Sequence, residues 1–313
     1  MSRFILSRLW QAFLVLVIVS IIVFSMMRLI PGDPIFIMLG DEYSPQAYER
    51  LKAQFGLDQP VFVQYFLWIK DILRGEFGYS YISHKDVSTL LLDAFYPTFV
   101  LVIGTVIVGL IIAFPSGIIA AIKRDTHIDY LSMSFAITGY SMPSFWKGII
   151  LIWVFAVILR WFPTMGYVSP LENFSKALWH MILPSITLGT FFAGLVARII
   201  RSSLLEVLDQ DYIKMARAKG VKQAALVYKH ALQNSLIPVV TVIGLQFGAL
   251  LGGAVLTEVV FSLPGLGRLT VTAIFNREYH VVQASVLIQV VFVVLTNFAV
   301  DVTYAFLNPK IRY

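Results

Sequence analysis

The chain has 313 residues, of which 58% are hydrophobic and only 13% are charged. Charged residues make up about 25% of an ordinary soluble domain, so this composition excludes a soluble protein and indicates a polytopic membrane protein. The net charge is +6 and cysteine is absent, which excludes disulfides, thiolate metal sites and cysteine nucleophiles.

The N-terminus combines two arginines with a long apolar run. Arg3 and Arg8 precede residues 9–27, which carry no charge. A cleaved signal peptide has a shorter apolar region that ends in a small-residue cleavage site, whereas Arg28 and Pro31 follow this run. We therefore expect residues 1–30 to form a cytoplasmic end and an uncleaved first transmembrane helix.

Residues 31–93 are too many for a simple turn, and they carry nine acidic and five basic residues. Ser44 is a candidate N-cap with Pro45 at the first helical position. Residues 61–73 form a second, aromatic-rich amphipathic stretch. We expect an extracytoplasmic loop with two short helices at the membrane interface, which either pack on the membrane surface or dock an external protein.

Four further charge-free runs predict transmembrane helices, because a helix crosses the hydrocarbon core with about 20 apolar residues. They are residues 94–122, 177–197, 231–257 and 281–300. Residues 130–159 are interrupted by Pro143 and Lys147, and we expect one kinked helix there, since neighbouring helices can satisfy the backbone near a proline. The prediction is an all-α polytopic protein with six transmembrane helices, a five-helix core at 94–308 and a tail at 309–313.

The basic residues predict the orientation, because cytoplasmic loops collect Lys and Arg. The segment 198–229 holds seven basic and three acidic residues. Placing it inside gives both termini a cytoplasmic location and leaves the acidic segment 31–93 outside. The other inner residues are then Arg3, Arg8, Lys123, Arg124, Lys310 and Arg312. A seven-helix arrangement would put the most basic loop outside, so we reject it.

Motifs of catalysis are absent. The chain has no G-x-x-x-x-G-K-[ST], H-E-x-x-H or G-x-S-x-G pattern, and its five histidines show no ligand spacing. We expect no catalytic residue, metal site or cofactor on this chain, which leaves a transporter, channel, receptor or structural subunit. An ion- or proton-coupled carrier usually places ionisable groups within its spans. The candidates here are few, namely Lys147, Glu258 and Asp301.

Lys147 is the one basic residue inside the interrupted third span. A lysine at the centre of a span costs about 2.5–3.5 kcal/mol on insertion scales, so its side chain should face protein, water or a solute path. In one hypothesis it lines a translocation path with Tyr140 and Ser141 and meets the carboxylate of a peptide-like solute. In the other it snorkels to the interface.

The inner loop, residues 201–236, contains a predicted short helix at 211–220. Ala216, Ala218 and Gly220 are small and allow a partner to approach the backbone closely, and Gly220 suits a left-handed helix C-cap. Lys214, Arg217 and Lys219 surround them with positive charge. From the chemistry alone, this loop contacts either a protein partner or anionic lipid.

A second glycine-containing turn is expected outside, between the fifth and sixth spans. Its two glycines are available for positive φ. It forms either a compact re-entrant turn or an outer gate that contacts a binding protein. Its candidate residues are Pro264, Gly265, Gly267 and Arg268.

A series of motifs, in order over essentially the whole chain, resembles the permease subunits of ABC importers for dipeptides, oligopeptides, nickel and glutathione. The motifs are Pro31-Gly-Asp-Pro34, Phe55-Gly-Leu-Asp-Gln-Pro60, Gly75-Glu-Phe-Gly-Tyr-Ser80, Ser141-Met-Pro-Ser-Phe145, Phe162-Pro-Thr-Met-Gly166, Leu183-Pro-Ser185, Ala216-Arg-Ala-Lys-Gly220, Pro264-Gly-Leu-Gly-Arg268 and Asn308-Pro-Lys-Ile-Arg312. ABC-importer permeases at large carry Glu-Ala-Ala where this chain has Lys214, Met215 and Ala216. The peptide and nickel branch often lacks that glutamate too, so no salt bridge is inferred from it.

The resemblance implies a type I ABC-importer permease fold in a prokaryotic cytoplasmic (inner) membrane. It implies a second homologous permease subunit, two ATPase subunits that bind ATP and Mg, and an extracytoplasmic solute-binding protein, with no nucleic acid. The chain would form half of an alternating-access path for a small solute, most simply a dipeptide, oligopeptide or peptide-like molecule. The expected ATPase-coupling residues are Asp211, Tyr212, Lys214, Ala216, Arg217, Ala218 and Gly220. The alternatives are a secondary carrier or channel, and a receptor subunit without net uptake.

Overall fold

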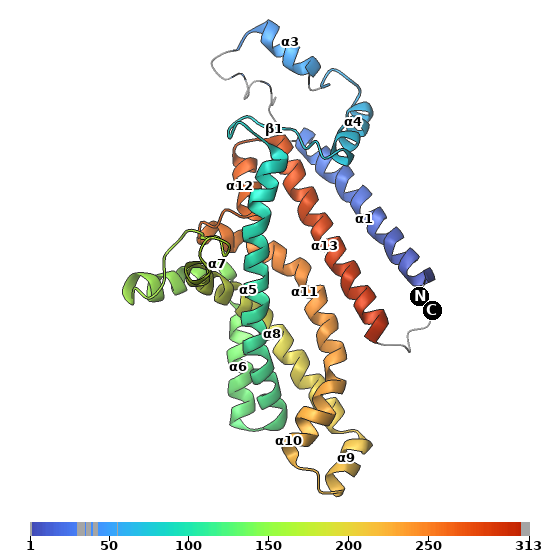
Figure 1. Cartoon of the computed structure of the whole chain (residues 1–313), viewed down its shortest axis with the longest axis vertical. Helices are drawn as coiled ribbons and strands as arrows, with labels where there is room; N and C mark the ends of the chain where they lie inside the picture. The colour runs from blue at the N-terminus through green and yellow to red at the C-terminus, as the bar shows by residue number, and fades with distance from the viewer. Residues whose placement is uncertain (1, 30–34, 36–38, 40–42, 55, 308–313) are drawn as a thin grey trace.

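The computed structural model describes residues 2–29, 35, 39, 43–54 and 56–307 and is almost entirely helical (Figure 1). The motifs at 31–34 and 308–312, residue Phe55 and the predicted tail at 309–313 lie outside these residues. Five helices of the described part are long and apolar enough to cross a membrane. They are α1 (Ser2–Leu29), α5 (Val87–Ile122), α8 (Phe174–Leu208), α11 (Leu232–Val260, the last part of the span Gln223–Val260) and α13 (Tyr279–Leu307).

The interrupted third span is bent much more sharply than a kinked helix. Helix α6 (His127–Ser141) meets α7 (Ser144–Leu151), which continues into the π-helix η2 (Ile152–Ile158), at 104°. Proline lacks an N–H group and disfavours helical backbone at the residue before it. Met142 and Pro143 both adopt ψ of 133°. Two consecutive extended residues turn the chain aside, so α7 points away from the bundle (Figure 1).

Helix α8 forms the centre of the core and contacts α5, α6, α7 and α11. Its residues Phe192, Val196, Ile200 and Leu204 are fully buried and recur every four residues, which places them on one helical face. Helix α5 packs closely against this face through glycine. A Cβ at Gly117 would lie 2.8 Å from the Ile200 side chain.

One end of the bundle, which we call the hairpin end, carries the short elements of the predicted extracytoplasmic loop (Figure 1). Ser44 Oγ accepts a hydrogen bond from Ala47 N at 3.1 Å, which confirms the predicted N-cap of α3 (Pro45–Gln54). Helix α4 (Val61–Leu73) rests on α1, where Tyr65 and Ser20 share a hydrogen bond of 2.8 Å. The hairpin of β1 (Tyr79–Ser80) and β2 (Lys85–Asp86) leads into α5, and α12 (Leu266–Phe275) packs nearby.

The opposite end, which we call the α9 end, carries α9 (Asp211–Ala218), α10 (Gln223–Ala225) and the π-helix η3 (Leu226–Ala231). These three elements connect α8 to α11. The turn between α5 and α6, residues 123–126, lies at the same end, because Arg124 and Asp209 approach to 3.8 Å. The turn between α5 and α6 and the connection between α8 and α11 therefore lie at the same end of the bundle.

Candidate functional site

Helix α9 is attached to the bundle along one edge and exposes the rest of its surface. Ile213 is 0% exposed within the main core, and Ala216 is half-buried beside it. Arg217 and Lys219 are exposed, and Met215 is 60% exposed. A short helix thus presents a basic surface with an apolar side chain at the α9 end. This surface is chemically suited to contact another protein.

Gly220 ends α9 in the left-handed conformation that the sequence predicts, with φ of 81°. Its N–H donates to Arg217 O at 3.0 Å, and Val221 N–H donates to Ala216 O at 3.3 Å. These two bonds form a Schellman motif, and the half-buried Val221 and Ala216 supply its apolar part. A Cβ at Gly220 would meet nothing within 4 Å. Within this chain, the glycine is therefore required by its backbone conformation and not by packing.

The polar residues of α9 have separate roles. Lys214 Nζ lies 3.1 Å from Asp211 Oδ1, and both side chains are exposed, so this ion pair contributes little to stability. Tyr212 Oη accepts a hydrogen bond of 2.9 Å from Asn234 Nδ2. Asn234 lies in the first turn of α11 and was not predicted from the sequence, because the contact joins residues on separate helices. This hydrogen bond ties α9 to α11, in addition to the chain connection between α8 and α9.

The turn at the hairpin end differs from its predicted geometry. Neither Gly265, with φ of −96°, nor Gly267 adopts positive φ, and Ser262 takes that conformation instead. Both glycines are buried. Neighbouring atoms occupy the space that a side chain would need at each position. A Cβ at Gly265 would overlap the Glu258 carboxyl group, and one at Gly267 would lie 2.6 Å from Val255 Cα. The glycines permit close approach, and Pro264 and Arg268 are the exposed residues of the turn.

The Glu258 carboxyl group fills this turn and is fully buried. It accepts hydrogen bonds from Thr98 Oγ1 at 2.6 Å and from Arg268 N at 3.0 Å. Leu266 N–H in turn donates to Thr98 Oγ1 at 2.8 Å. A carboxylate at the N-terminus of α12 is favoured by the free N–H groups there. Glu258 thus joins α11, α5 and α12, a role that its position at the end of an apolar run did not reveal.

A second acid, beyond the C-terminus of α12, anchors the hairpin. Glu278 Oε1 accepts hydrogen bonds from Ser80 Oγ at 2.5 Å and from Ile82 N at 3.3 Å. Burial and the nearby Glu278 carboxylate raise the pKa of the Tyr81 phenol above its ordinary value. The hairpin is thereby fixed to the segment between α12 and α13.

Lys147 is buried at the break between α6 and α7, with 8% of its surface exposed. Its Nζ donates to Gly139 O at 2.6 Å and to Thr190 Oγ1 at 2.7 Å. The lysine therefore bonds a carbonyl at the end of α6 and a hydroxyl of α8. Of the other two predicted path residues, Tyr140 is 41% exposed and stacks on Phe191 of α8. Ser141 is exposed and donates to Ile137 O at 3.0 Å.

Two sequence profiles cover most of the chain. Residues 113–313 match the profile described as binding-protein-dependent transport system inner membrane component, and residues 1–102 match its N-terminal counterpart. The chain belongs to this family. It is accordingly a membrane-spanning permease subunit of an ABC importer, a transport component and not an enzyme.

Individual relatives agree with this assignment. The chain is 43% identical over 313 residues, covering 100% of both chains, to the glutathione transport system permease protein GsiC of Escherichia coli K12. Identity to GsiC of Salmonella typhimurium LT2 is 44% with the same coverage. An inward-facing structure of the MetNI methionine ABC transporter has a TM-score of 0.59 and 19% identity, over 70% of this chain and 96% of that one. This structural likeness supports the fold.

The ionisable groups that an ion-coupled carrier would need have structural partners here. Glu258 caps α12. Asp301, near the C-terminus of α13, lies 3.3 Å from Arg8, near the N-terminus of α1. Among the described residues, no group of three or more His, Asp or Glu side chains could hold a metal ion. The family assignment sets the carrier alternative aside.

Proposed function

We propose that this chain is one of two homologous permease subunits of an importer for glutathione or a similar small peptide. A solute-binding protein delivers the solute on the hairpin side, and two ATPase subunits bind ATP and Mg on the α9 side. The full-length likeness to GsiC supports the solute class.

The observation that carries the coupling role is the way α9 is attached. Its buried Ile213 fixes it to the core, while its basic residues and Met215 remain exposed beyond the long helices. A partner that pushes on this surface moves α8 and α11, to which α9 is tied. Energy coupling requires a contact that differs between two states, and α9 offers the contact surface for it.

Gly220→Glu tests this role in vesicles that contain the complete transporter. The substitution forces a non-glycine residue into left-handed backbone, which costs about 1–2 kcal/mol, and adds negative charge to the basic surface. We expect binding-protein-stimulated ATP hydrolysis and uptake to be lost while the complex still assembles. Gly75→Glu is the matched control, because Gly75 has φ of 83° and equally open surroundings at the hairpin end. Loss of coupling in both variants, or in neither, would contradict a docking role for α9.

The solute class is tested by uptake in the same vesicles. Labelled glutathione is offered with the cognate binding protein, and unlabelled dipeptides, oligopeptides and a nickel chelate compete with it. We expect competition by short peptides alone. Competition by the nickel chelate and by no peptide would overturn the proposed solute class and leave the permease role intact.

A further inference from the structure

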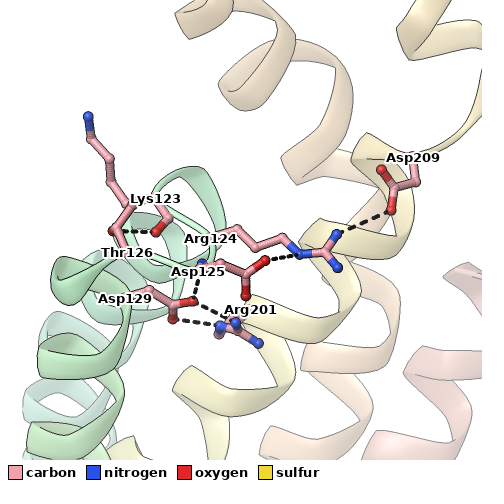
Figure 2. A network of polar contacts seen from close by, with 7 residues as sticks. All are labelled: Lys123, Arg124, Asp125, Thr126, Asp129, Arg201 and Asp209. Carbon is pink, nitrogen blue, oxygen red and sulfur yellow. Dashed lines mark hydrogen bonds and ion pairs between the residues drawn. The ribbon is translucent and has the colours of Figure 1, made fainter.

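A buried ion pair joins α6 to α8 at the α9 end (Figure 2). Asp129, in the first turn of α6, is 1% exposed. Arg201 of α8 donates from Nε to Asp129 Oδ1 at 2.8 Å and from Nη2 to Oδ2 at 2.6 Å. The backbone N–H of Asp125 donates to the same Oδ2 at 3.0 Å. Three charge-assisted or backbone hydrogen bonds thus hold this one carboxylate.

The charged residues around this pair are exposed to solvent. Arg124 lies 3.2 Å from Asp125 and 3.8 Å from Asp209, and all three side chains are more than half exposed. Exposed pairs of this sort contribute little free energy. Among the described ion pairs, the contact between Asp129 and Arg201 alone combines a buried carboxylate with the two-bond geometry that fixes a planar guanidinium against it, and the Arg201 side chain is 27% exposed.

A buried ion pair is a poor means of stabilising a helix contact, because well-packed apolar residues do as well or better. Its effect is directional instead, since the two bonds form in one relative position of the helices. When α6 slides along α8, a buried charge loses its partner. The pair therefore resists relative movement of the two helices far more than apolar packing does.

Helix α6 is also fixed to α8 at its other end. The rings of Tyr140 and Phe191 stack with centroids 4.8 Å apart. Lys147 bonds both Gly139 O of α6 and Thr190 Oγ1 of α8. A displacement of α8 is thus passed to α6 at both ends and reaches the break at residues 142–143, beside Tyr140, Ser141 and Lys147.

We propose that Asp129 and Arg201 are positioning residues of transport, which make α6 move with α8 when the ATPases displace α9. This inference rests on the proposed coupling role of α9. When the pair is intact, movement of α9 is transmitted through Ile213 to α8. The contact of Arg201 with Asp129 then transmits the movement of α8 to α6. Without the pair, the contacts of Tyr140 and Lys147 still hold α6 to α8 near the break, but the end of α6 beside α9 lags behind α8, so ATP hydrolysis continues while the solute path opens less often.

Asp129→Asn in the reconstituted transporter tests the proposal through the ratio of ATP hydrolysed to solute transported. We expect this ratio to rise about tenfold, within the range known for residues that carry coupling between sites. Arg201→Lys keeps the charge and loses the planar two-bond geometry, and it should give an intermediate rise. The matched control is Asp125→Asn. It makes the same chemical change in an exposed residue, and Asn tolerates its left-handed backbone, with φ of 60°.

A second measurement follows the helices directly. The chain has no cysteine, so Ile128→Cys on α6 and Glu206→Cys on α8 accept spin labels without further changes. Both positions are exposed. Pulsed electron paramagnetic resonance should give a distance that changes little between ATP-bound and nucleotide-free states. In the Asp129→Asn background we expect a shifted or broader distribution upon ATP binding.

The outcomes separate the two proposals. A fully coupled Gly220→Glu variant would overturn the proposed role of α9. Loss of stimulated ATP hydrolysis and uptake in Gly220→Glu, beside wild-type ratios in Asp129→Asn and Arg201→Lys, would overturn the present inference alone. If Asp129→Asn fails to assemble, Arg201→Lys decides, because a merely structural pair lowers uptake and ATP hydrolysis together and leaves their ratio unchanged.

Discussion

A glycine is required in a buried turn when another group occupies the space of its Cβ. At Gly265 that group is the carboxyl of Glu258, which also caps α12. We expect Gly265→Ala to lower the stability of the purified complex by about 1–3 kcal/mol, the usual cost of overpacking. Thermal unfolding in detergent measures it. Pro264→Ala, at an exposed position of the same turn, should have a smaller effect, and equal losses would contradict this account.

The sequence reveals residue roles that depend on local chain geometry and hides those that depend on distant contacts. The left-handed cap at Gly220 follows from its position after a short helix, and the N-cap at Ser44 follows from the proline after it. The pairing of Asp129 with Arg201 joins residues 72 positions apart. Neither residue lies in a motif, so only the fold brings them together.

At the scale of helices, Lys147 acts across the break between α6 and α7. Without its ammonium group, Gly139 O loses a hydrogen bond in a partly buried site, which costs about 1–3 kcal/mol, while Thr190 Oγ1 keeps its bond to Thr187 O. We expect Lys147→Met to lower the thermal stability of the complex, whereas Lys176→Met, at an exposed position of α8, should not. Unchanged stability in Lys147→Met would show that these bonds contribute nothing.

The path hypothesis for Lys147 makes a separate prediction in the same variant. If Lys147 meets the carboxylate of a peptide-like solute, Lys147→Met reduces uptake of solutes with a free carboxylate more than uptake of their amides, at an unchanged ratio of ATP to solute. Equal effects on both would leave Lys147 with its structural role alone.

The long helices were predictable because the thickness of the hydrocarbon core sets their length. Predicted runs such as 94–122 and 177–197 lie inside α5 and α8, which extend beyond them. The angle of the turn at Pro143 could not be predicted from the sequence. A proline within a helix permits a kink, and it also disfavours helical backbone at the residue before it. Here Met142 and Pro143 are both extended, which gives the larger angle.

At the scale of the whole molecule, the bent pair decides how many times the chain crosses the membrane. Helix α5 ends at the turn 123–126, and the ion pair of Asp129 with Arg201 places the start of α6 beside the last turns of α8. Helices α5 and α8 therefore both end at the α9 end. If α5 and α8 each cross the bilayer, the chain between them must also cross, so α6, α7 and η2 act as one broken span. The chain then crosses the membrane six times and not five.

Cysteine labelling in intact cells tests this topology, since the chain has no cysteine of its own. The excess of Lys and Arg near the α9 end predicts that this end is cytoplasmic. An impermeant thiol reagent should therefore label Glu76→Cys and Leu171→Cys from outside and Ala224→Cys only after permeabilisation. All three positions are exposed. Labelling of Leu171→Cys from inside would mean that the bent pair re-enters the membrane without crossing it. Labelling of Ala224→Cys from outside would reverse the orientation and remove α9 from the reach of ATPases in the cytoplasm.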